Sequence, residues 1–493
     1  MNIHCFKQLS RQTRTLCGRG LVTAILASAT SFATAGTEYS ITPADTQTQE
    51  ESSFSQWWNG KQMLPFPGRD TLEEHGLKFK GKYTGAFYGV VDSEKGARGF
   101  YDQEVEFGAE LDFSKALNVD ALKGLKAFGG VRWRDSRQNS NPNDFVEASG
   151  NFQPSHLQSG TQWRLLTFGL EYTTPELFGV KDFLAVRGGW VRPQKEFIDQ
   201  PLSKLFVNNS FESSKGIGGN IPFSSSCSTW GGTLQVKPTN IWYLKGGAFL
   251  AFPQATASSN HGLAFEGYAP NPSQNGVLFM GETGVTPKLG SSELPGKYAF
   301  GGYYYGQWNT SYFGERYPGK YGFYWQGDQM LFRESSPAPE STVEAKGPSD
   351  GKSIADGKSF KSFKEPVSMD KPKLSDQGLS LFSLVTFAPK YDNILPFYFH
   401  TGLVYKGLIP GRDNDQTMFA FGYGQYSFYN IQALQDRGVV NQPNYTGVLE
   451  WDYRIQINGW AFLQPFAQYI FRPNGTGAVA NGTVFGFETG LAF

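Results

Sequence analysis

A strict two-residue alternation runs through Leu449-Glu450-Trp451-Asp452-Tyr453-Arg454-Ile455-Gln456-Ile457, where odd positions are apolar or aromatic and even positions are charged or amide. Successive side chains of a β-strand point to opposite faces, so this strand has one apolar face and one polar face. A soluble β-sandwich can also contain such strands, but it packs their apolar faces against a second sheet. The chain has no matching set of fully apolar core strands, so the stretch favours a transmembrane β-barrel.

The same alternation recurs along the chain and at its end. It is clear in Phe397–Lys406 and less regular in Phe300–Trp308, where glycines allow a strand to bend. In the last segment, Phe487 and Leu491 share a face with the terminal Phe493. A chain that ends on an aromatic residue inside an alternating strand resembles the closing strand of outer-membrane barrels, whose assembly machinery recognises that ending. We therefore expect an all-β, antiparallel transmembrane barrel.

The composition agrees with strands and tight turns. The chain has 59 Gly, 42 Phe, 24 Tyr and 11 Trp but only 6 Met and 3 Cys, which is a poor composition for packed helices. Lys and Arg total 44 and Asp and Glu total 44, so the formal net charge is +0. This balance does not favour nucleic acid or an anionic membrane surface as a partner, and we expect no nucleic-acid binding.

The first 35 residues have the pattern of a secretory signal peptide. Basic residues up to Arg19 precede a short apolar run, Leu21–Ala27, and Ala33–Ala35 supply the small residues that a signal peptidase accepts. The apolar run falls well short of the roughly 20 residues that a spanning helix needs. Cleavage after Ala35 leaves Cys227 as the one remaining cysteine, so no internal disulfide is expected. The five histidines are isolated, and we expect neither a metal nor another cofactor.

Two regions do not alternate. Residues 36–76 form a polar tail in which Asp70 can cap a short helix that ends at Gly76, and we interpret them as a short periplasmic N-terminal segment before a barrel domain at 77–493. Residues 335–377 are rich in Ser, Pro, Lys, Asp and Glu, which cannot bury enough apolar surface to fold alone. We predict a long hydrophilic extracellular loop there. A linker between two domains is the alternative, although the alternation resumes at Leu379.

Three segments of the C-terminal third carry a resemblance to a known family. Gly402–Asp415 contains a strand and the turn Pro410-Gly411-Arg412, and Glu450–Ile457 and Gln464–Gly475 follow in order. Together they resemble the last strands of the carbohydrate-selective porins of the OprB family. The chain departs from the family pattern at Phe66–Arg69, at Gly189-Trp190 and at Phe466, where an acidic residue is usual. These departures leave the identity of the solute open.

The resemblance implies an architecture and a role. It implies a barrel of about 16 antiparallel strands with short periplasmic turns and longer outer loops, some of which fold inward to narrow the pore. It also implies a place in the bacterial outer membrane, surrounded by its lipid, and passive diffusion of small mono- or oligosaccharides into the periplasm. The assembly machinery would recognise Phe493, and the porin would be a monomer or a trimer.

Sugars present hydroxyl groups and apolar ring faces, so guanidinium–carboxylate pairs and aromatic rings suit a channel that passes them. The candidate channel-lining residues are Glu104, Glu106, Arg132, Arg134, Arg187, Trp190, Arg192, Arg412, Asp415, Glu450, Asp452, Arg454, Gln464, Phe466 and Gln468. Charges on an inner wall also pair across strands without touching solute. Arg412 and Asp415 are equally expected to brace a turn, and outward Trp residues belong to the interfacial girdle.

Other functions remain as alternatives. A porin for anions or other small polar solutes is favoured if Arg132, Arg134, Arg187 and Arg192 converge without carboxylate partners. A closed structural or adhesive surface barrel is a second alternative. An enzyme is not expected, because carboxylates two residues apart on a strand, such as Glu104 and Glu106, point the same way and leave no room for a substrate between them. The sequence also contains no G-x-S-x-G nucleophile motif.

Overall fold

The computed structural model describes residues 68–91, 98–136, 145–158, 160–212, 215–224, 226–335 and 375–493, together with Ser55, Trp58, Gly60, Met63 and Leu64. All of them belong to one compact unit, Ser53–Phe493. The expected signal peptide at 1–35 lies outside the described residues, as do most of 36–67 and nearly all of 335–377.

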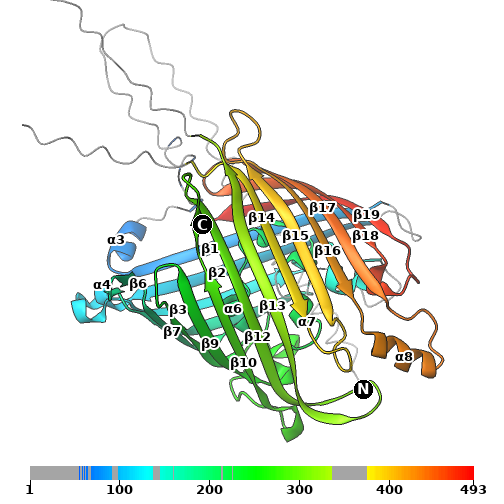
Figure 1. The fold of residues 1–493 in the computed structure, drawn as a ribbon. Coiled ribbons are helices and arrows are strands. Elements are labelled where there is room, and N and C mark those ends of the chain that lie inside the picture. Colours follow the sequence, from blue (N-terminus) through cyan, green and yellow to red (C-terminus); the bar gives the residue numbers. More distant parts are fainter. Residues whose placement is uncertain are drawn as a thin grey trace, which may run out of the picture. The chain divides into compact units, whose positions relative to one another are not determined.

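Sixteen strands of the described residues pair in sequence order and close into an antiparallel barrel (Figure 1). The wall consists of β1 (Leu77–Val90), β2 (Arg98–Asp112), β3 (Leu125–Asp135), β4 (Gln162–Thr173), β7 (Leu184–Val191), β8 (Thr229–Val236), β9 (Trp242–Ala251), β10 (Gly276–Val285), β12 (Leu294–Thr310), β13 (Arg316–Arg333), β14 (Gly378–Phe387), β15 (Phe397–Lys406), β16 (Gln416–Gln425), β17 (Tyr445–Gln456), β18 (Ala461–Phe471) and β19 (Gly482–Ala492). β19 closes the barrel against β1, from Lys82 opposite Ala492 to Val90 opposite Val484. The predicted all-β barrel of about 16 strands is confirmed.

Short elements occupy the connections between strands. The helices are α3 (Arg69–Glu74), α4 (Phe113–Leu117), α5 (Phe145–Ala148), α6 (Pro193–Phe197), α7 (Lys215–Gly218) and α8 (Phe428–Asp436). The 3-10 turns are η1 (Asp120–Leu122), η2 (Gly150–Phe152), η3 (Ser203–Leu205), η4 (Asn209–Phe211), η5 (Pro253–Ala255), η6 (Ser258–Asn260), η7 (Pro272–Gln274) and η8 (Pro473–Gly475). β5 (Glu176–Leu177) pairs with β6 (Val180–Lys181), and β11 (Lys288–Leu289) pairs with β12. No helix of the described residues is long and apolar enough to cross a membrane.

The helix expected near residue 70 is present, but it starts one residue earlier than its predicted cap. Gly68 is the N-cap residue in a left-handed conformation and makes no side-chain cap hydrogen bond. Asp70 lies in the first turn, where a carboxylate suits the positive end of the helix. Arg69 is buried and donates through a guanidinium NH2 to the Phe79 carbonyl at 2.9 Å, so it joins the helix to the start of β1.

The two ends of the barrel differ in their connections. In Figure 1, α3 and α4 lie at one end and α8 lies at the other. Phe493 pairs with Gly81 near the first end, and the connections there are mostly short, such as 237–241 and 457–460. Short turns and the chain termini belong to the periplasmic side of such barrels, so we take the α3 end as periplasmic.

Strand direction makes two of the sequence-based expectations incompatible with each other. β13 ends at Arg333 and β14 begins at Gly378, and these two residues are paired at the end of the barrel that also carries α3 and Phe493. A periplasmic N-terminal segment and an extracellular 335–377 loop therefore exclude each other. From Leu77 at the start of β1 to Arg333 at the end of β13, the chain crosses the barrel an even number of times. Both residues therefore lie at the same end of the barrel.

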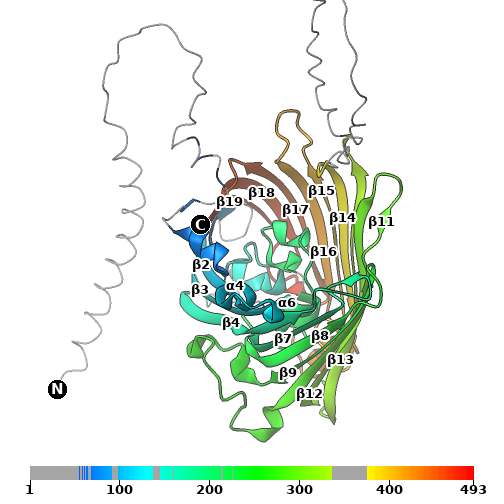
Figure 2. The same cartoon turned by 90° about the vertical axis from the view of Figure 1, so that its left-hand side faces the viewer.

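Two segments between strands fold into the barrel, as the family resemblance implied. We call residues 145–160 and 192–228 the inner segments; they follow β3 and β7. Figure 2, which looks into the end with α3 and α4, shows α6 inside the ring of strands. Phe152 and Phe211 are fully buried in a cluster that also contains Phe382 and Tyr398 of the wall. The hydrophobic core of this molecule thus lies between the inner segments and the wall.

The wall has the two faces that the alternation predicted. On β17, Trp451 is 48% exposed on the outer side, whereas Glu450 is 1% exposed on the inner side. Phe485 and Phe487 of β19 are also exposed on the outside. Apolar residues outside and polar residues inside are what a strand between lipid and a water-filled interior requires.

Candidate functional site

A polar hollow of about 110 Å³ lies between the inner segments and the part of the wall formed by β1, β2 and β3. The wall contributes Lys82, Glu104, Glu106, Arg132 and Arg134, and the inner segments contribute His156, Arg192, Gln194, Lys195, Lys204, Phe206 and Glu212. Five of the sequence-predicted residues are brought together here, namely Glu104, Glu106, Arg132, Arg134 and Arg192.

Strand register places the wall charges in rows. Lys82 lies opposite Glu106, which lies opposite Arg132. In the next row, Glu104 lies opposite Arg134. Residues directly opposite in an antiparallel pair are close enough for their side chains to interact. The inner face of β1–β3 is therefore a lattice of alternating charges that the backbone holds in place.

Glu104 is shared between two guanidinium groups. Arg134 donates through Nε to Glu104 Oε2 at 2.7 Å and makes a second contact through NH2, while Arg132 Nε lies 3.7 Å from the same oxygen. Arg132 also donates through NH2 to Ser226 Oγ of an inner segment at 2.6 Å. All three wall residues are almost fully buried, so this cluster orients the guanidinium groups more than it contacts solute.

Glu106 and Lys82 are the wall residues most open to a solute. The Glu106 side chain is 36% exposed, compared with 9% for Glu104, and Lys82 is exposed. Arg192 NH1 approaches Glu106 Oε1 at 4.0 Å from the inner-segment side. The hollow therefore offers a solute the exposed groups of Glu106 and Lys82, with the Arg192 guanidinium beside them.

The inner-segment side of the hollow is rich in cations. Burial and the nearby Lys195 ammonium lower the pKa of Lys204 to about 7. Burial and Arg192 likewise lower the pKa of Lys195. Counting both sides, Lys82, Arg132, Arg134, Arg192, Lys195 and Lys204 face three carboxylates, Glu104, Glu106 and Glu212. The described lining thus carries an excess of positive charge.

The predicted residues of β17 and β18 point inward, but the inner segments cover them. Glu450, Asp452, Gln464 and Gln468 are each at most 2% exposed. Glu450 accepts backbone amides of residues 207 and 208, and Gln464 donates to the Leu205 carbonyl at 2.8 Å. Glu450, Gln464 and Gln468 therefore hold the inner segments to the wall, while Asp452 accepts from Gln464 at 2.7 Å. Contact of these residues with solute stays a prediction.

The two other predicted residues of these strands also meet the inner segments. Arg454 donates through Nε to Gln464 Oε1 at 2.6 Å, and its guanidinium lies 4.0 Å from the centre of the Phe462 ring. Phe466 is 3% exposed and packs in the cluster with the inner segments. An aromatic residue is thus suited to position 466, because the inner segments cover the wall there.

Trp190 does not line the lumen, which corrects its sequence-based assignment. It lies opposite Trp230 on β8 and packs edge-on against Trp230 and Phe265. This is the outer face, because Leu234, four residues from Trp230 on β8 and so on the same face, is 51% exposed there. Residues 252–275, which contain Phe265, cover the ring. Arg187 is three positions away and so points inward, as the period of two requires.

Arg187, Arg412 and Asp415 are engaged in close pairs. Arg187 contacts Glu171 at 2.7 Å and Glu196 of an inner segment at 3.1 Å. Arg412 donates to both oxygens of Asp415, at 2.8 and 2.9 Å. Asp415 also accepts from the Tyr453 hydroxyl at 2.7 Å and from the Gln456 amide at 2.9 Å. The geometry favours the turn-bracing interpretation of Arg412 and Asp415.

Sequence reasoning missed seven lining residues: Lys82, His156, Gln194, Lys195, Lys204, Phe206 and Glu212. The sequence could have identified Lys82, because Lys82 lies directly opposite Glu106 in the first hairpin. The other six belong to the inner segments, where no two-residue period marks a side chain as facing the lumen. Their positions depend on how the inner segments pack.

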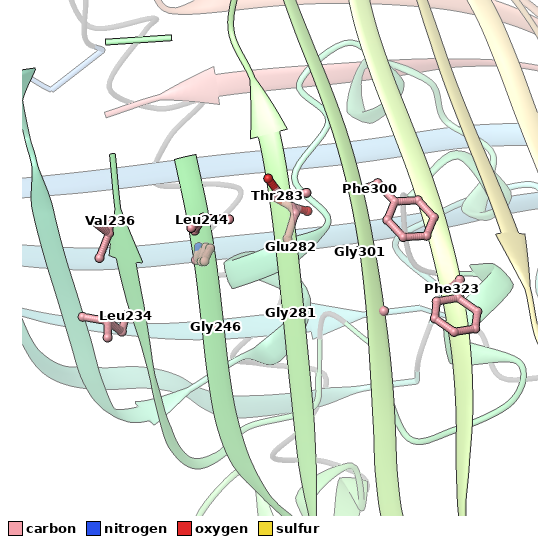
Figure 3. A pocket seen from close by; sticks show the side chains of 12 residues that line it. Leu234, Val236, Leu244, Gly246, Gly281, Glu282, Thr283, Phe300, Gly301 and Phe323 are labelled. Carbon is pink, nitrogen blue, oxygen red and sulfur yellow. The ribbon is translucent and has the colours of Figure 1, made fainter. Parts of the chain in front are cut away.

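A larger hollow, about 530 Å³, opens on the outer surface and is not part of the lumen (Figure 3). Leu234, Gly246, Gly281, Gly302 and Phe323 follow one another in register across five strands. At Gly246 and Gly281 an added Cβ would meet nothing within 4 Å, so the missing side chains leave a shallow trough between apolar neighbours. Its apolar lining suits hydrocarbon.

The described residues hold no group of three His, Cys, Asp or Glu side chains placed to bind a metal ion. The hollow of β1–β3 instead offers guanidinium, ammonium and carboxylate groups. These can exchange hydrogen bonds with hydroxyl groups or attract an anion.

Comparisons with known proteins agree with this architecture. The family described as "Carbohydrate-selective porin, OprB family" matches residues 95–349 and 361–493. The chain is 24% identical over 477 residues to Porin B of Pseudomonas aeruginosa, covering 90% of this chain and 92% of that protein. Its fold is similar to the high-pH structure of Pseudomonas putida OprB, with a TM-score of 0.70 and 21% identity, covering 87% of this chain and 96% of the other.

Proposed function

The chain belongs to the OprB family of carbohydrate-selective porins, and from that premise we propose that sugars cross the barrel through the hollow between β1–β3 and the inner segments. It is an outer-membrane porin through which small carbohydrates diffuse into the periplasm, and porins of this family are not enzymes. The observation that carries the proposal is the meeting of Glu106, Lys82 and Arg192 at one hollow.

The chemistry of these groups fits transient binding of a polyol. Glu106 accepts hydrogen bonds from hydroxyl groups, and Lys82 and Arg192 donate them. Each such bond contributes little net free energy because it replaces a bond to water. Weak binding of this kind allows a sugar to enter and to leave again, which passive diffusion needs.

Liposome swelling tests the proposed path. We expect Glu106→Gln and Lys82→Met to weaken the apparent affinity for glucose about two- to tenfold, because one hydrogen bond contributes on the order of 0.5–1.5 kcal/mol. Lys288→Met is the matched control, since Lys288 is an exposed lysine paired with Glu293 in a turn. Glucose entry that is unchanged in both variants would place the sugar path elsewhere.

The cation excess supports a second candidate, permeation of acidic sugars or other small anions. Reversal potentials across a KCl gradient measure it directly, and we expect a preference for chloride over potassium. If cations are preferred, this second candidate fails while the sugar path is unaffected.

Finer features of the assembled porin are also proposals. Phe493 extends the pairing of β19 with β1 through two backbone hydrogen bonds with Gly81, at 2.9 and 3.0 Å. We expect the barrel-assembly machinery to recognise this end, so Phe493→Ala should slow insertion without changing the channels that do form. The porin is a monomer or a trimer in its lipid environment, and sedimentation of the detergent-solubilised protein distinguishes the two.

A further inference from the structure

We propose that Glu450 is a positioning residue that sets the width of the channel by fixing the 192–228 inner segment to the wall, beside Gln468, which binds both inner segments. It acts from β17, which lies three strands from β1 in the closed barrel, through the backbone of residues 207 and 208. This inference rests on the proposed function, because the segments that Glu450 holds form one side of the proposed sugar path.

Both carboxylate oxygens of Glu450 bind the same turn. Oε1 accepts the Val207 amide at 2.7 Å, and Oε2 accepts the Asn208 amide at 3.0 Å. Glu450 is 1% exposed, so neither bond competes with bulk water. The Asn208 amide also lies 3.3 Å from Oε1, so two backbone amides converge on one buried carboxyl group.

Gln468 completes a clamp that includes the other inner segment. It lies directly opposite Glu450 on β18. Its Oε1 accepts from Asn208 Nδ2 at 3.1 Å, and its Nε2 donates to the Pro154 carbonyl at 2.9 Å. Asn208 Nδ2 also donates to the Phe152 carbonyl at 3.1 Å. Two neighbouring wall residues thus bind both inner segments at the place where these segments meet.

The clamped turn leads directly to the hollow. Lys204 and Phe206 precede residue 207, and Glu212 follows shortly after 208. His156, another lining residue, donates its backbone amide to the Val207 carbonyl at 2.9 Å. The turn at 207–208 is therefore held by the wall on one side and holds lining residues of both inner segments on the other.

Because the turn at 207–208 connects the wall to the lining residues, loss of the clamp is expected to change the hollow. If the turn detaches, the inner segments keep their covalent ends at β3, β4, β7 and β8 but lose their fixed distance from β1–β3. The hollow then widens intermittently, and the conductance fluctuates upward. Loss of one buried hydrogen bond raises the population of the detached state by up to about tenfold.

Single-channel recording of Glu450→Gln in KCl without sugar tests the inference. The amide keeps the size of the side chain but turns an NH2 toward one of the two backbone amides, so one anchor bond becomes repulsive. We expect stepwise channels that spend about tenfold more time in a higher-conductance state than the original protein. Swelling assays should also show faster entry of a trisaccharide relative to glucose.

Glu282→Gln is the matched control. Glu282 is also an inward, buried wall glutamate, but it accepts from the wall side chains Tyr243 at 2.7 Å, Tyr324 at 2.9 Å and Gln326 at 2.8 Å. A general loss of barrel stability would affect both variants. The Glu450 variant should fluctuate far more, because Glu450 binds inner-segment backbone directly, whereas Glu282 reaches the Phe197 carbonyl only through Gln326.

Asn208→Ala provides a second variant that leaves the strands untouched. It removes the donor to Gln468 and Phe152, and we expect the same fluctuations as for Glu450→Gln. Steady channels of unchanged conductance in both folded variants would overturn the positioning role. The readout uses ions alone, so it remains valid if sugars prove to take another path, which the swelling assays on the Glu106 and Lys82 variants detect separately.

Discussion

At the scale of single residues, the charged side chains of the hollow are of two kinds. Some are locked in close, buried ion pairs, and others are free in the sense that they keep exposed surface. Glu104 is locked between Arg132 and Arg134, whereas Glu106 retains exposed carboxylate surface. A locked pair has satisfied its hydrogen bonds and has little to offer a hydroxyl group. The free residues of β1 and β2 are therefore expected to dominate contact with solute, and the locked ones to maintain the positive potential around it.

Lys204 makes the charge of the hollow depend on pH. Burial and Lys195 lower its pKa to about 7, whereas the direct contact of Lys204 Nζ with the Asp199 carboxylate favours the charged form. The ammonium is charged below that pH and neutral above it. We expect the preference for chloride over potassium to fall between pH 6 and pH 8. The measurement is the reversal potential across a KCl gradient.

Lys204→Gln serves as the control for this pH dependence. It should give the lower chloride preference at both pH values, with little change between them. A preference that varies with pH equally in the variant and in the original protein would assign the titration to another group.

At the scale of elements, each strand of the wall has one face toward lipid and one face toward the interior of the barrel. On β17, Glu450 lies inside and Trp451 outside, as the alternating stretch predicted. The irregular inner segments follow no such period. Their packing against Tyr398, Phe382 and the other inward rings decides where Lys204 and Phe206 lie, and that packing is a long-range property.

This difference explains what the sequence predicted and what it did not. Alternation located the wall charges of β2 and β3 but also suggested Glu450 and Gln468 as solute contacts, because it cannot reveal that a segment from another part of the chain covers them. Trp190 is a different case. Trp190 lies three residues from Arg187, so the two-residue period of a strand already places them on opposite faces. The sequence-based prediction grouped them because they are close in sequence.

Exchanging the outer residue of β17 tests the assignment of its faces. We expect Trp451→Arg to destabilise the barrel by about 2–4 kcal/mol if the residue lies near the middle of the bilayer, because a guanidinium must then enter hydrocarbon. Urea unfolding in lipid vesicles, followed by the heat-modifiable shift in gel mobility, measures the change. Trp451→Phe is the control and should unfold almost as the original protein does. Equal stability of the Arg and Phe variants would contradict the assignment.

At the scale of the whole molecule, the proposed sugar path lies to one side of the barrel. The inner segments are bonded to β13–β18, through residues such as Gln326, His400 and Glu450, and leave the hollow against β1–β3. The same topology brings the start of β1, the C-terminal Phe493 and the paired strand ends Arg333 and Gly378 to one mouth. The connection 334–377 departs from the general pattern of short periplasmic turns.

We expect residues 334–377 to be periplasmic, which a protease site inserted at position 350 can test. The insertion should be resistant to protease in intact cells and cleaved after the outer membrane is permeabilised. The same site inserted after Gly438, which follows α8 at the opposite end, should be cleaved in intact cells. Cleavage at position 350 in intact cells would reverse the orientation that we assign to the barrel.

The central claim is that this barrel is an open channel in which sugars bind weakly on their way through. Planar-bilayer recording of the purified full chain during a glucose titration tests it most directly. The account predicts discrete conductance steps whose size falls with glucose and saturates, beyond the decrease that viscosity alone produces. A membrane that stays closed, or steps that glucose changes only through viscosity, would contradict it.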